Sequence, residues 1–204
     1  RMAVFEITNE QYNTYAGATG TASKSQWVDT QVPANNMNWY DAAKFVNWLN
    51  TQAGSHVAYN FSGGSFAPWS EGQAAGGTNL FRHKDAKYFL PTENEWIKAG
   101  YWNGENLQTY ATADGELPVA GVESNYNYAI NEPWRVGSGT RELNGTYDMM
   151  GNVLEWMENP MLVGDYSADG HPSMRGWGYG YSAGTSGITP YSQVAGSPDS
   201  EQPY

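Results

Sequence analysis

The chain contains no cysteine. Disulfide bridges, thiolate metal sites and cysteine nucleophiles are therefore excluded. Charged residues are also scarce, at 15% of the chain, and acids outnumber bases to give a formal net charge of −11. That charge disfavours binding to nucleic acid phosphates and to anionic membrane surfaces, and it is compatible with binding cations. No apolar run approaches the roughly 18 residues of a membrane span.

Glycine and large aromatic residues are abundant, with 24 Gly, 9 Trp and 15 Tyr among 204 residues. This balance is typical of loop-rich folds, and the length fits one domain over residues 1–204 with a substantial core. The sequence opens in an apparent strand at Arg1 and stops at Tyr204. We therefore expect a fragment trimmed at both ends, in which missing targeting signals say little about location.

Three capping boxes predict the starts of three helices. They lie at Thr8–Gln11, Asn38–Asp41 and Thr92–Glu95. We expect a short helix from about 9 to 16, a second that ends at Gly54, and a third that ends near Gly100. The second is supported by an apolar stripe at i, i+3, i+4 and i+7, formed by Ala42, Phe45, Val46 and Leu49.

Short strands are expected elsewhere, together with much irregular chain. The strand-like runs are Met2–Ile7, Tyr88–Pro91, 117–122, 153–157 and 173–179. Residues 60–79 are rich in glycine and contain Pro68, which indicates a long surface insertion. We expect its aromatic residues, Phe66 and Trp69, to pin it to the domain.

The stretch from Gly145 to Pro160 combines a turn with two carboxylates. Gly151-Asn152 is a turn dipeptide, and the residues after it predict a short strand. A reversal there would bring Asp148 and Glu155 near each other. Two carboxylates plus turn carbonyls are hard oxygen ligands, which suit Ca²⁺. The alternative is an ordinary hairpin with two solvated acids.

Four stretches stand in the order found in one known family: 6–12 (EITNEQY), 37–43 (MNWYDAA), 89–96 (FLPTENEW) and 147–156 (YDMMGNVLEW). A fifth, Met174–Gly178, looks like a degraded Arg-Gly-Gly-Ser-Trp stretch of the same family. Together they resemble the formylglycine-generating enzyme, or sulfatase-modifying factor, family. The resemblance implies an α+β fold of the C-type-lectin-like kind, with few short helices, a small twisted antiparallel sheet and much irregular chain.

The resemblance also implies a calcium site at the turn. Its ligands would be the side chains of Asp148 and Glu155 and the carbonyls of Gly151 and Val153. A second calcium site of the family would begin at Asn125 and Tyr126, but its remaining ligands lie in a segment, 127–144, that cannot be aligned.

The family's oxidase converts a substrate cysteine to formylglycine with a pair of copper-binding cysteines. This chain has no cysteine, so we expect neither copper nor that activity. Another branch holds a non-haem iron with a histidine cluster. Here His56, His83 and His171 are far apart in sequence, and we expect surface or loop histidines.

The C-terminal segment 177–193 has the Tyr, Ser, Gly and Trp bias of adaptable recognition loops. We expect it to bind a small molecule, a glycan or a peptide, through Arg175, Trp177, Tyr179, Tyr181 and Tyr191. The alternative is a plain loop whose aromatics cover the core. In relatives encoded beside diversity-generating retroelements, the matching segment carries the variable ligand surface.

Two other functions stay open. One is an enzyme of altered chemistry, with acid/base candidates at Glu93, Glu95, Glu155 and Glu158. The other is a partner-binding role without a small ligand. An extracellular or cell-surface setting is expected from the resemblance, and its millimolar calcium would fill even a weak site.

Overall fold

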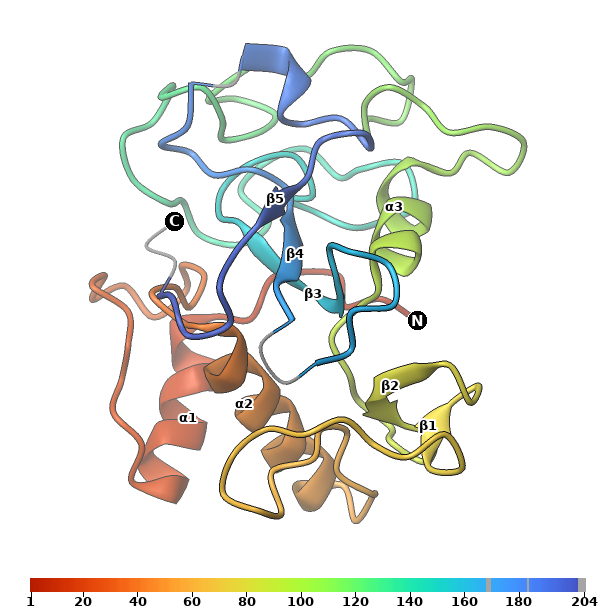
Figure 1. Ribbon diagram of the computed structural model, residues 1–204. Coiled ribbons are helices and arrows are strands. Elements are labelled where there is room, and N and C mark those ends of the chain that lie inside the picture. The colour runs from red at the N-terminus through yellow and green to blue at the C-terminus, as the bar shows by residue number, and fades with distance from the viewer. Residues whose placement is uncertain (168–169, 183, 202–204) are drawn as a thin grey trace.

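The computed structural model describes residues 1–167, 170–182 and 184–201 (Figure 1). It combines three α-helices with two small antiparallel sheets and long irregular connections. The elements are α1 (Asn9–Thr19), α2 (Trp39–Gln52), β1 (Ala74–Ala75), β2 (Asn79–His83), α3 (Glu93–Tyr101), β3 (Glu155–Pro160), β4 (Pro172–Arg175), the 3₁₀ turn η1 (Gly184–Ser186) and β5 (Val194–Ala195). This confirms the expected α+β fold.

Each α-helix begins at a predicted capping box. The side chains of Thr8, Asn38 and Thr92 accept from backbone amides three residues on, and the residue at that third position reaches back to the cap amide. Helix α1 runs three residues past the predicted end at 16, because Gly17 is tolerated inside it and the left-handed residue that ends it is Gly20, with φ 74°.

Helix α2 lies beside α1 and faces the larger sheet (Figure 1). Its Trp39 is 1% exposed, and the indole Nε1 donates to the carbonyl of Met157 in β3 at 3.0 Å. Phe45 and Val46 are buried in the same core, as the apolar stripe predicted. The helix is therefore fixed to the strand that follows the candidate site.

The larger sheet has the strand order β3-β4-β5, and all its pairs are antiparallel. Trp156 opposes Met174, and the register shifts between Trp156 and Pro160. Helix α3 lies on the side of the sheet away from α1 and α2 (Figure 1). Two buried clusters form the core, and Trp177, just after β4, packs against both.

Three expected strands are not formed. Residues 2–7, 88–91 and 117–122 are irregular, because their backbone groups bond to loops and side chains instead of a neighbouring strand. The carbonyl of Ile7 accepts from Ala34 N at 2.8 Å, and Tyr88 N donates to Asn50 Oδ1 at 2.9 Å. A β-branched and aromatic composition is therefore not sufficient to form a strand when no partner strand lies alongside.

The segment 60–79 contains structure that the sequence did not suggest. Its residues form β1 and the start of β2, joined through a turn in which Gly76 and Gly77 have positive φ. Phe66 is buried at 6% exposure, and Trp69 Nε1 donates to the carbonyl of Ala58 at 2.8 Å. These two aromatic residues anchor the segment to the domain. No helix in the described part of the chain is long and apolar enough to cross a bilayer.

Candidate functional site

The turn at 148–155 is built from residues in unusual backbone conformations. Asp148, Gly151 and Asn152 have φ values of 64°, 116° and 60°. A Cβ at Gly151 would collide with the carbonyl oxygen of Asn125, so only glycine fits there. The turn is not a β-hairpin, because β3 begins at Glu155 and pairs with β4 and not with the chain before the turn. The strand expected from 153 therefore starts two residues later.

Both predicted carboxylate ligands are held by indole groups. Asp148 is 5% exposed, and its two oxygens accept from Trp134 Nε1 and Gly137 N, each at 2.8 Å. Glu155 Oε2 accepts from Trp96 Nε1 at 3.1 Å. Asp148 is thus not a solvated hairpin acid.

Two further carboxyl groups, Glu6 and Glu142, lie near the turn. Glu6 Oε2 accepts from Asn152 Nδ2 at 2.8 Å, while Glu6 Oε1 is buried and has no hydrogen-bond partner among the described residues. Glu142 is 6% exposed and accepts from Thr146 Oγ1 at 3.0 Å. Sequence reasoning missed both as site residues. The only signal was the place of Glu6 at the head of the 6–12 motif.

Burial raises the pKa of all four carboxyls, and for Glu6, Glu142 and Glu155 the neighbouring carboxylates raise it further. The pKa of Glu155 rises to about 7 and that of Glu142 to about 8. No lysine or arginine is among the groups that shift these pKa values, and none of the ion pairs formed by described residues includes them. Arg175 opposes Glu155 across β3 and β4, but its guanidinium pairs with Glu93.

The donor set can be tested for its fit to a calcium ion. A Cβ at Gly176 would lie 3.4 Å from the carbonyl oxygen of Val153 and 3.7 Å from Glu155 Oε1. These two predicted ligand atoms therefore face the same small space, which a larger residue at 176 would narrow. In the described part of the chain, no group of three or more His, Cys, Asp or Glu side chains is arranged to hold a metal. A cation at the turn would thus combine carboxylates with backbone carbonyls, a donor set that fits Ca²⁺.

The residues of the second predicted calcium site touch this turn. The carbonyl of Asn125 accepts from Asn152 N at 2.7 Å, and Asn125 Nδ2 donates to the carbonyl of Glu132 at 3.0 Å. Asn125 Oδ1 is buried and finds no hydrogen-bond partner in the part of the chain that the structure describes. Tyr126 is buried, and its hydroxyl donates to the carbonyl of Pro118 at 2.8 Å. Asn125 therefore lies beside the first site, and its side-chain amide stabilises the 125–132 loop through the bond to Glu132.

The five predicted ligand-binding residues differ widely in exposure. Arg175 is buried, and its guanidinium binds Glu93 Oε1 as well as the carbonyls of Pro190 and Ser192. Tyr179 is 5% exposed, whereas Tyr191 is 76% exposed. Trp177 and Tyr181 are partly buried, with ring centroids 5.4 Å apart.

Tyr128 is an exposed aromatic residue next to this segment that the sequence did not reveal. Its amide donates to the carbonyl of Tyr179 at 2.9 Å, and 53% of the residue is exposed. It follows Asn127, and both residues have φ 56°, which is uncommon for a bulky side chain.

The expectation of three surface or loop histidines is wrong for His83. This residue ends β2 and is 6% exposed, and its ring stacks on that of His56 with centroids 3.5 Å apart. Because in-plane lone pairs of parallel rings do not converge, the stack is unsuited to binding one metal ion.

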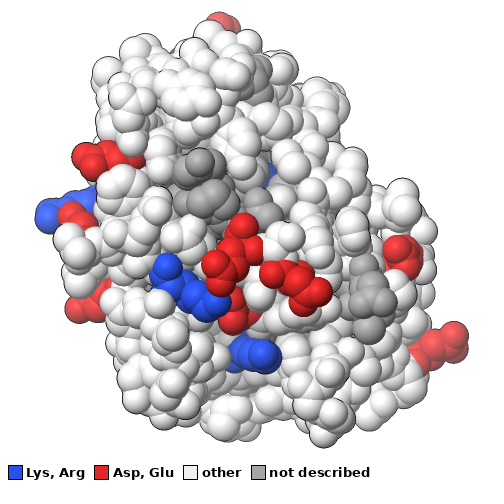
Figure 2. Space-filling view, turned by 60° about the vertical axis from the view of Figure 1, so that its left-hand side comes forward, with Lys and Arg blue, Asp and Glu red and all other residues white. Residues whose placement is uncertain are grey.

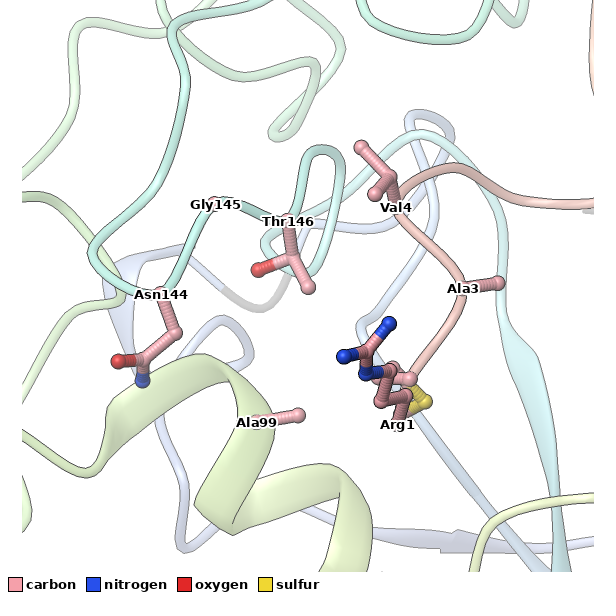
Figure 3. Close-up of a pocket in the computed structure, with 8 residues that line it drawn as sticks. Arg1, Ala3, Val4, Ala99, Asn144, Gly145 and Thr146 are labelled. Atoms are coloured by element: carbon pink, nitrogen blue, oxygen red, sulfur yellow. The ribbon is translucent and has the colours of Figure 1, made fainter.

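A cavity of about 310 Å³ lies between the N-terminal residues, α3 and the 144–146 loop (Figure 3). It is lined by Arg1, Met2, Ala3, Val4, Ala99, Asn144, Gly145 and Thr146. None of these side chains is a carboxylate or an imidazole, so the cavity offers no general base of the usual kinds.

Several solved structures are similar to this chain. Treponema denticola variable protein 1 matches with a TM-score of 0.71 and 21% identity, over 97% of this chain and 79% of the other. CarF matches with a TM-score of 0.67 and 21% identity, over 98% and 81%. PvdO from Pseudomonas aeruginosa matches with a TM-score of 0.66 and 16% identity, over 98% and 75%. At these identities the likeness shows the fold.

No curated protein matches the chain. The family model described as the sulfatase-modifying factor enzyme 1-like domain matches residues 1–197. With that match over nearly the whole chain, and with the fold of its structural neighbours, the chain belongs to the formylglycine-generating enzyme, or sulfatase-modifying factor, family.

Proposed function

We propose that the chain is a non-catalytic, calcium-stabilised ligand-binding domain whose ligand surface lies in the C-terminal segment 177–193. The observation that carries the proposal is the group of buried carboxyls around the turn, none of which forms an ion pair with a described residue. Burying several like charges without a counterion is costly, so the groups must take up either protons or a cation. A divalent cation would offset Asp148 and Glu155 together.

Calcium is the best candidate for that cation. The oxygens of Asp148, Glu155, Gly151 and Val153 are hard ligands, and Ca²⁺ tolerates the irregular geometry of a turn better than Mg²⁺ does. In this proposal the ion would fix the residues that precede β3. Since Gly151 N donates to the carbonyl of Gly176 at 2.7 Å, the ion would also support the start of the ligand segment. Asn125 and Tyr126 remain candidates for a second ion.

The ligand surface would be formed by the exposed part of the segment. Tyr191 is exposed, whereas Trp177 and Tyr181 are partly buried and would contribute only their accessible parts. Aromatic rings supply contact area at low entropic cost. Arg175 and Tyr179 would act from beneath, because Arg175 binds backbone carbonyls of the segment and Tyr179 is buried. Tyr128 would extend the surface on one side.

The ligand classes in this proposal are a small molecule, a glycan or a peptide. Nucleic acid is disfavoured by the net charge of −11, and Figure 2 shows acidic and basic side chains interspersed between large uncharged areas on one face. An extracellular or cell-surface setting would supply the calcium.

A retroelement-diversified binding protein is a specific form of this proposal. The likeness to a structure named as a variable protein favours it. A repeat of the DNA that encodes the 177–193 segment, beside a reverse-transcriptase gene, would support diversification. Its absence would leave a binding domain of fixed sequence.

An enzyme of altered chemistry is the second candidate, and raised carboxyl pKa values are the observation in its favour. The pKa values of Glu155 and Glu158 both rise to about 7, mainly because the groups are buried. Glu158 binds Tyr59 and Asn79 inside the core, Glu93 pairs with Arg175, and Glu95 caps α3. Each acid thus has a structural partner, which favours the binding function.

The experiment for the calcium part is isothermal titration of EDTA-stripped protein with CaCl₂. We expect binding by the wild type, no binding by Asp148→Ala and normal binding by Asp199→Ala, which removes an exposed acid. Equal binding by wild type and Asp148→Ala would contradict the assigned site. For the ligand part, a glycan and peptide array should show binding by the wild type that Tyr191→Ala weakens, with the exposed Tyr88→Ala as the matched control.

A further inference from the structure

Two of the three histidines meet in a stack made by three separate segments. His56 follows α2, His83 ends β2, and their rings lie 3.5 Å apart with an interplanar angle of 9°. Trp69, from the 60–79 segment, lies edge-on to both rings, at 4.8 Å from His83 and 5.6 Å from His56. We call His56, His83 and Trp69 the clasp.

Hydrogen-bond partners define where the protons lie in the neutral clasp. His56 Nδ1 is 2.9 Å from the carbonyl oxygen of Val57, which can only accept, so this nitrogen carries the proton. His83 Nδ1 is 3.2 Å from Asp85 N, which can only donate, so this nitrogen carries none. Protonating His83 would therefore set one N–H against another.

The clasp also joins the hydrogen bonds that hold the β1–β2 hairpin. Trp69 Nε1 and His83 N both donate to the carbonyl of Ala58, at 2.8 Å each. Trp69 N donates to the carbonyl of Leu80 at 2.7 Å. If the rings separate, these bonds lose the packing that shields them from water.

The charges around His83 are few. His56 lies over one face of the ring and is itself exposed. Lys84 points away to the carbonyl of Gly72, at 2.9 Å, and its charge also opposes protonation of His83. The Asp85 carboxylate, 3.8 Å from His83 Nδ1, favours protonation, but this side chain is 66% exposed and weakly effective.

We infer that the clasp is acid-sensitive. While both imidazoles are neutral, it holds the β1–β2 hairpin against the residues that follow α2. When both imidazoles carry a proton, the rings separate and this contact loosens. Burial and then the charge of His56 lower the pKa of His83 from its ordinary value. A lowered folded-state pKa means that the unfolded or opened form binds more protons. Stability from the clasp is therefore complete above the ordinary histidine pKa and is lost as pH falls below it.

The test is hydrogen exchange of indole N–H groups by NMR at about pH 7.5 and about pH 5, on either side of the ordinary histidine pKa. After correction for intrinsic rates, we expect Trp69 Nε1–H to lose protection at the lower pH, because the opened form binds more protons. Trp39 Nε1–H, which bonds Met157 in the core, serves as the internal reference and should keep its protection.

Two variants separate the clasp from general acid effects. His83→Asn keeps an acceptor for Asp85 N but cannot take a charge, so its Trp69 indole should stay protected at about pH 5. His171→Asn changes an exposed histidine outside the clasp and should behave as the wild type. If His83→Asn does not fold, His56→Phe replaces it, because phenylalanine keeps a ring on the stack without a charge. Equal protection of the wild-type Trp69 indole at both pH values would overturn the inference, as would a loss of protection in His83→Asn, or in His56→Phe, equal to that of the wild type.

Discussion

Glu158 is fully buried, and its charge is matched by a single arginine. Its carboxylate accepts from Tyr59 OH at 2.9 Å and from Asn79 Nδ2 at 2.5 Å, and Arg82 Nε lies 3.4 Å away. Burial raises the pKa of Glu158 to about 7, against the lowering effect of Arg82. By contrast, Asp148 and Glu155 form no ion pair with an arginine or lysine in the described part of the chain.

Removing Arg82 should therefore leave the buried Glu158 carboxylate without the opposite charge that Arg82 supplies. We expect Arg82→Leu to lower the free energy of unfolding by about 3 kcal/mol at pH 8, as for other broken buried pairs. The loss should be smaller at pH 5, because a carboxyl whose folded-state pKa is raised takes up its proton there. Chemical denaturation at both pH values measures this.

The matched control is Glu95→Gln. It removes the partly exposed Glu95–Arg82 pair, 3.4 Å apart, and keeps a side chain able to complete the capping box. It should change the free energy of unfolding by no more than about 0.5 kcal/mol. A loss as large as that of Arg82→Leu would show that the exposed pair, not the buried one, matters.

At the scale of elements, local capping signals predicted the helix starts, whereas strand signals were unreliable. Thr92 accepts from Glu95 N and Glu95 accepts from Thr92 N, a bond pattern within four residues that the sequence shows directly. Strands depend on a partner far along the chain, as β3 depends on β4 for the pairing of Trp156 with Met174. The β1–β2 hairpin, which begins within 60–79, was missed because the two-residue β1 has no periodic pattern.

The capping box of α3 gives a direct stability test. Thr92→Ala should cost about 1 kcal/mol, because Glu95 N loses its partner. Thr14→Ala, inside α1 where the hydroxyl bonds only the carbonyl of Glu10, should be neutral or slightly stabilising, since alanine favours helix interiors. Urea denaturation measures the free energy of unfolding of both variants, and an equal loss of this free energy in the two would argue against a capping role.

Arg175 joins α3 to the C-terminal segment. Its guanidinium binds Glu93 in α3 and the carbonyls of Pro190 and Ser192. Arg175→Lys keeps the charge but cannot make all of these bonds, so we expect faster proteolysis within 184–193. The control is Lys98→Arg, which exchanges the same two residue types at an α3 position away from the segment and should leave the rate of proteolysis unchanged. Unchanged cleavage in Arg175→Lys would leave Arg175 free for a direct role with a ligand.

At the scale of the whole molecule, the sequence motifs were sufficient for the family and fold, but not for the charge environment of the site. Asp148 and Glu155 could be picked from the turn motif. Glu6 and Glu142 could not, because Glu6 meets Asn152, 146 residues further on, only in the folded chain, and Glu142 stands outside the turn motif. The burial of Arg175 and Tyr179 could not be predicted either, because the composition of a Tyr- and Gly-rich segment is the same whether its rings face solvent or the core.

The buried carboxyls predict an unusual pH dependence without metal. Glu142 and Glu155 have raised folded-state pKa values of about 8 and about 7, so the stability they add is present at acidic pH and is lost as pH rises through those values. In EDTA the protein should melt at a higher temperature at pH 5.5 than at pH 8. Calcium should reduce this difference, because a bound cation stabilises the ionised carboxylates. An opposite slope in EDTA would show that these groups are ionised without a cation.

The most direct measurement is the melting temperature at pH 8 as a function of CaCl₂ concentration, with MgCl₂ as the comparison. At a hundredfold excess over the dissociation constant, calcium should add about 2.7 kcal/mol, or roughly 5 to 10 °C for a domain of this size. We predict that rise for the wild type and for Asp199→Ala, and its loss in Asp148→Ala. A melting temperature that calcium does not change, or a rise of the same size in Asp148→Ala, would contradict the account.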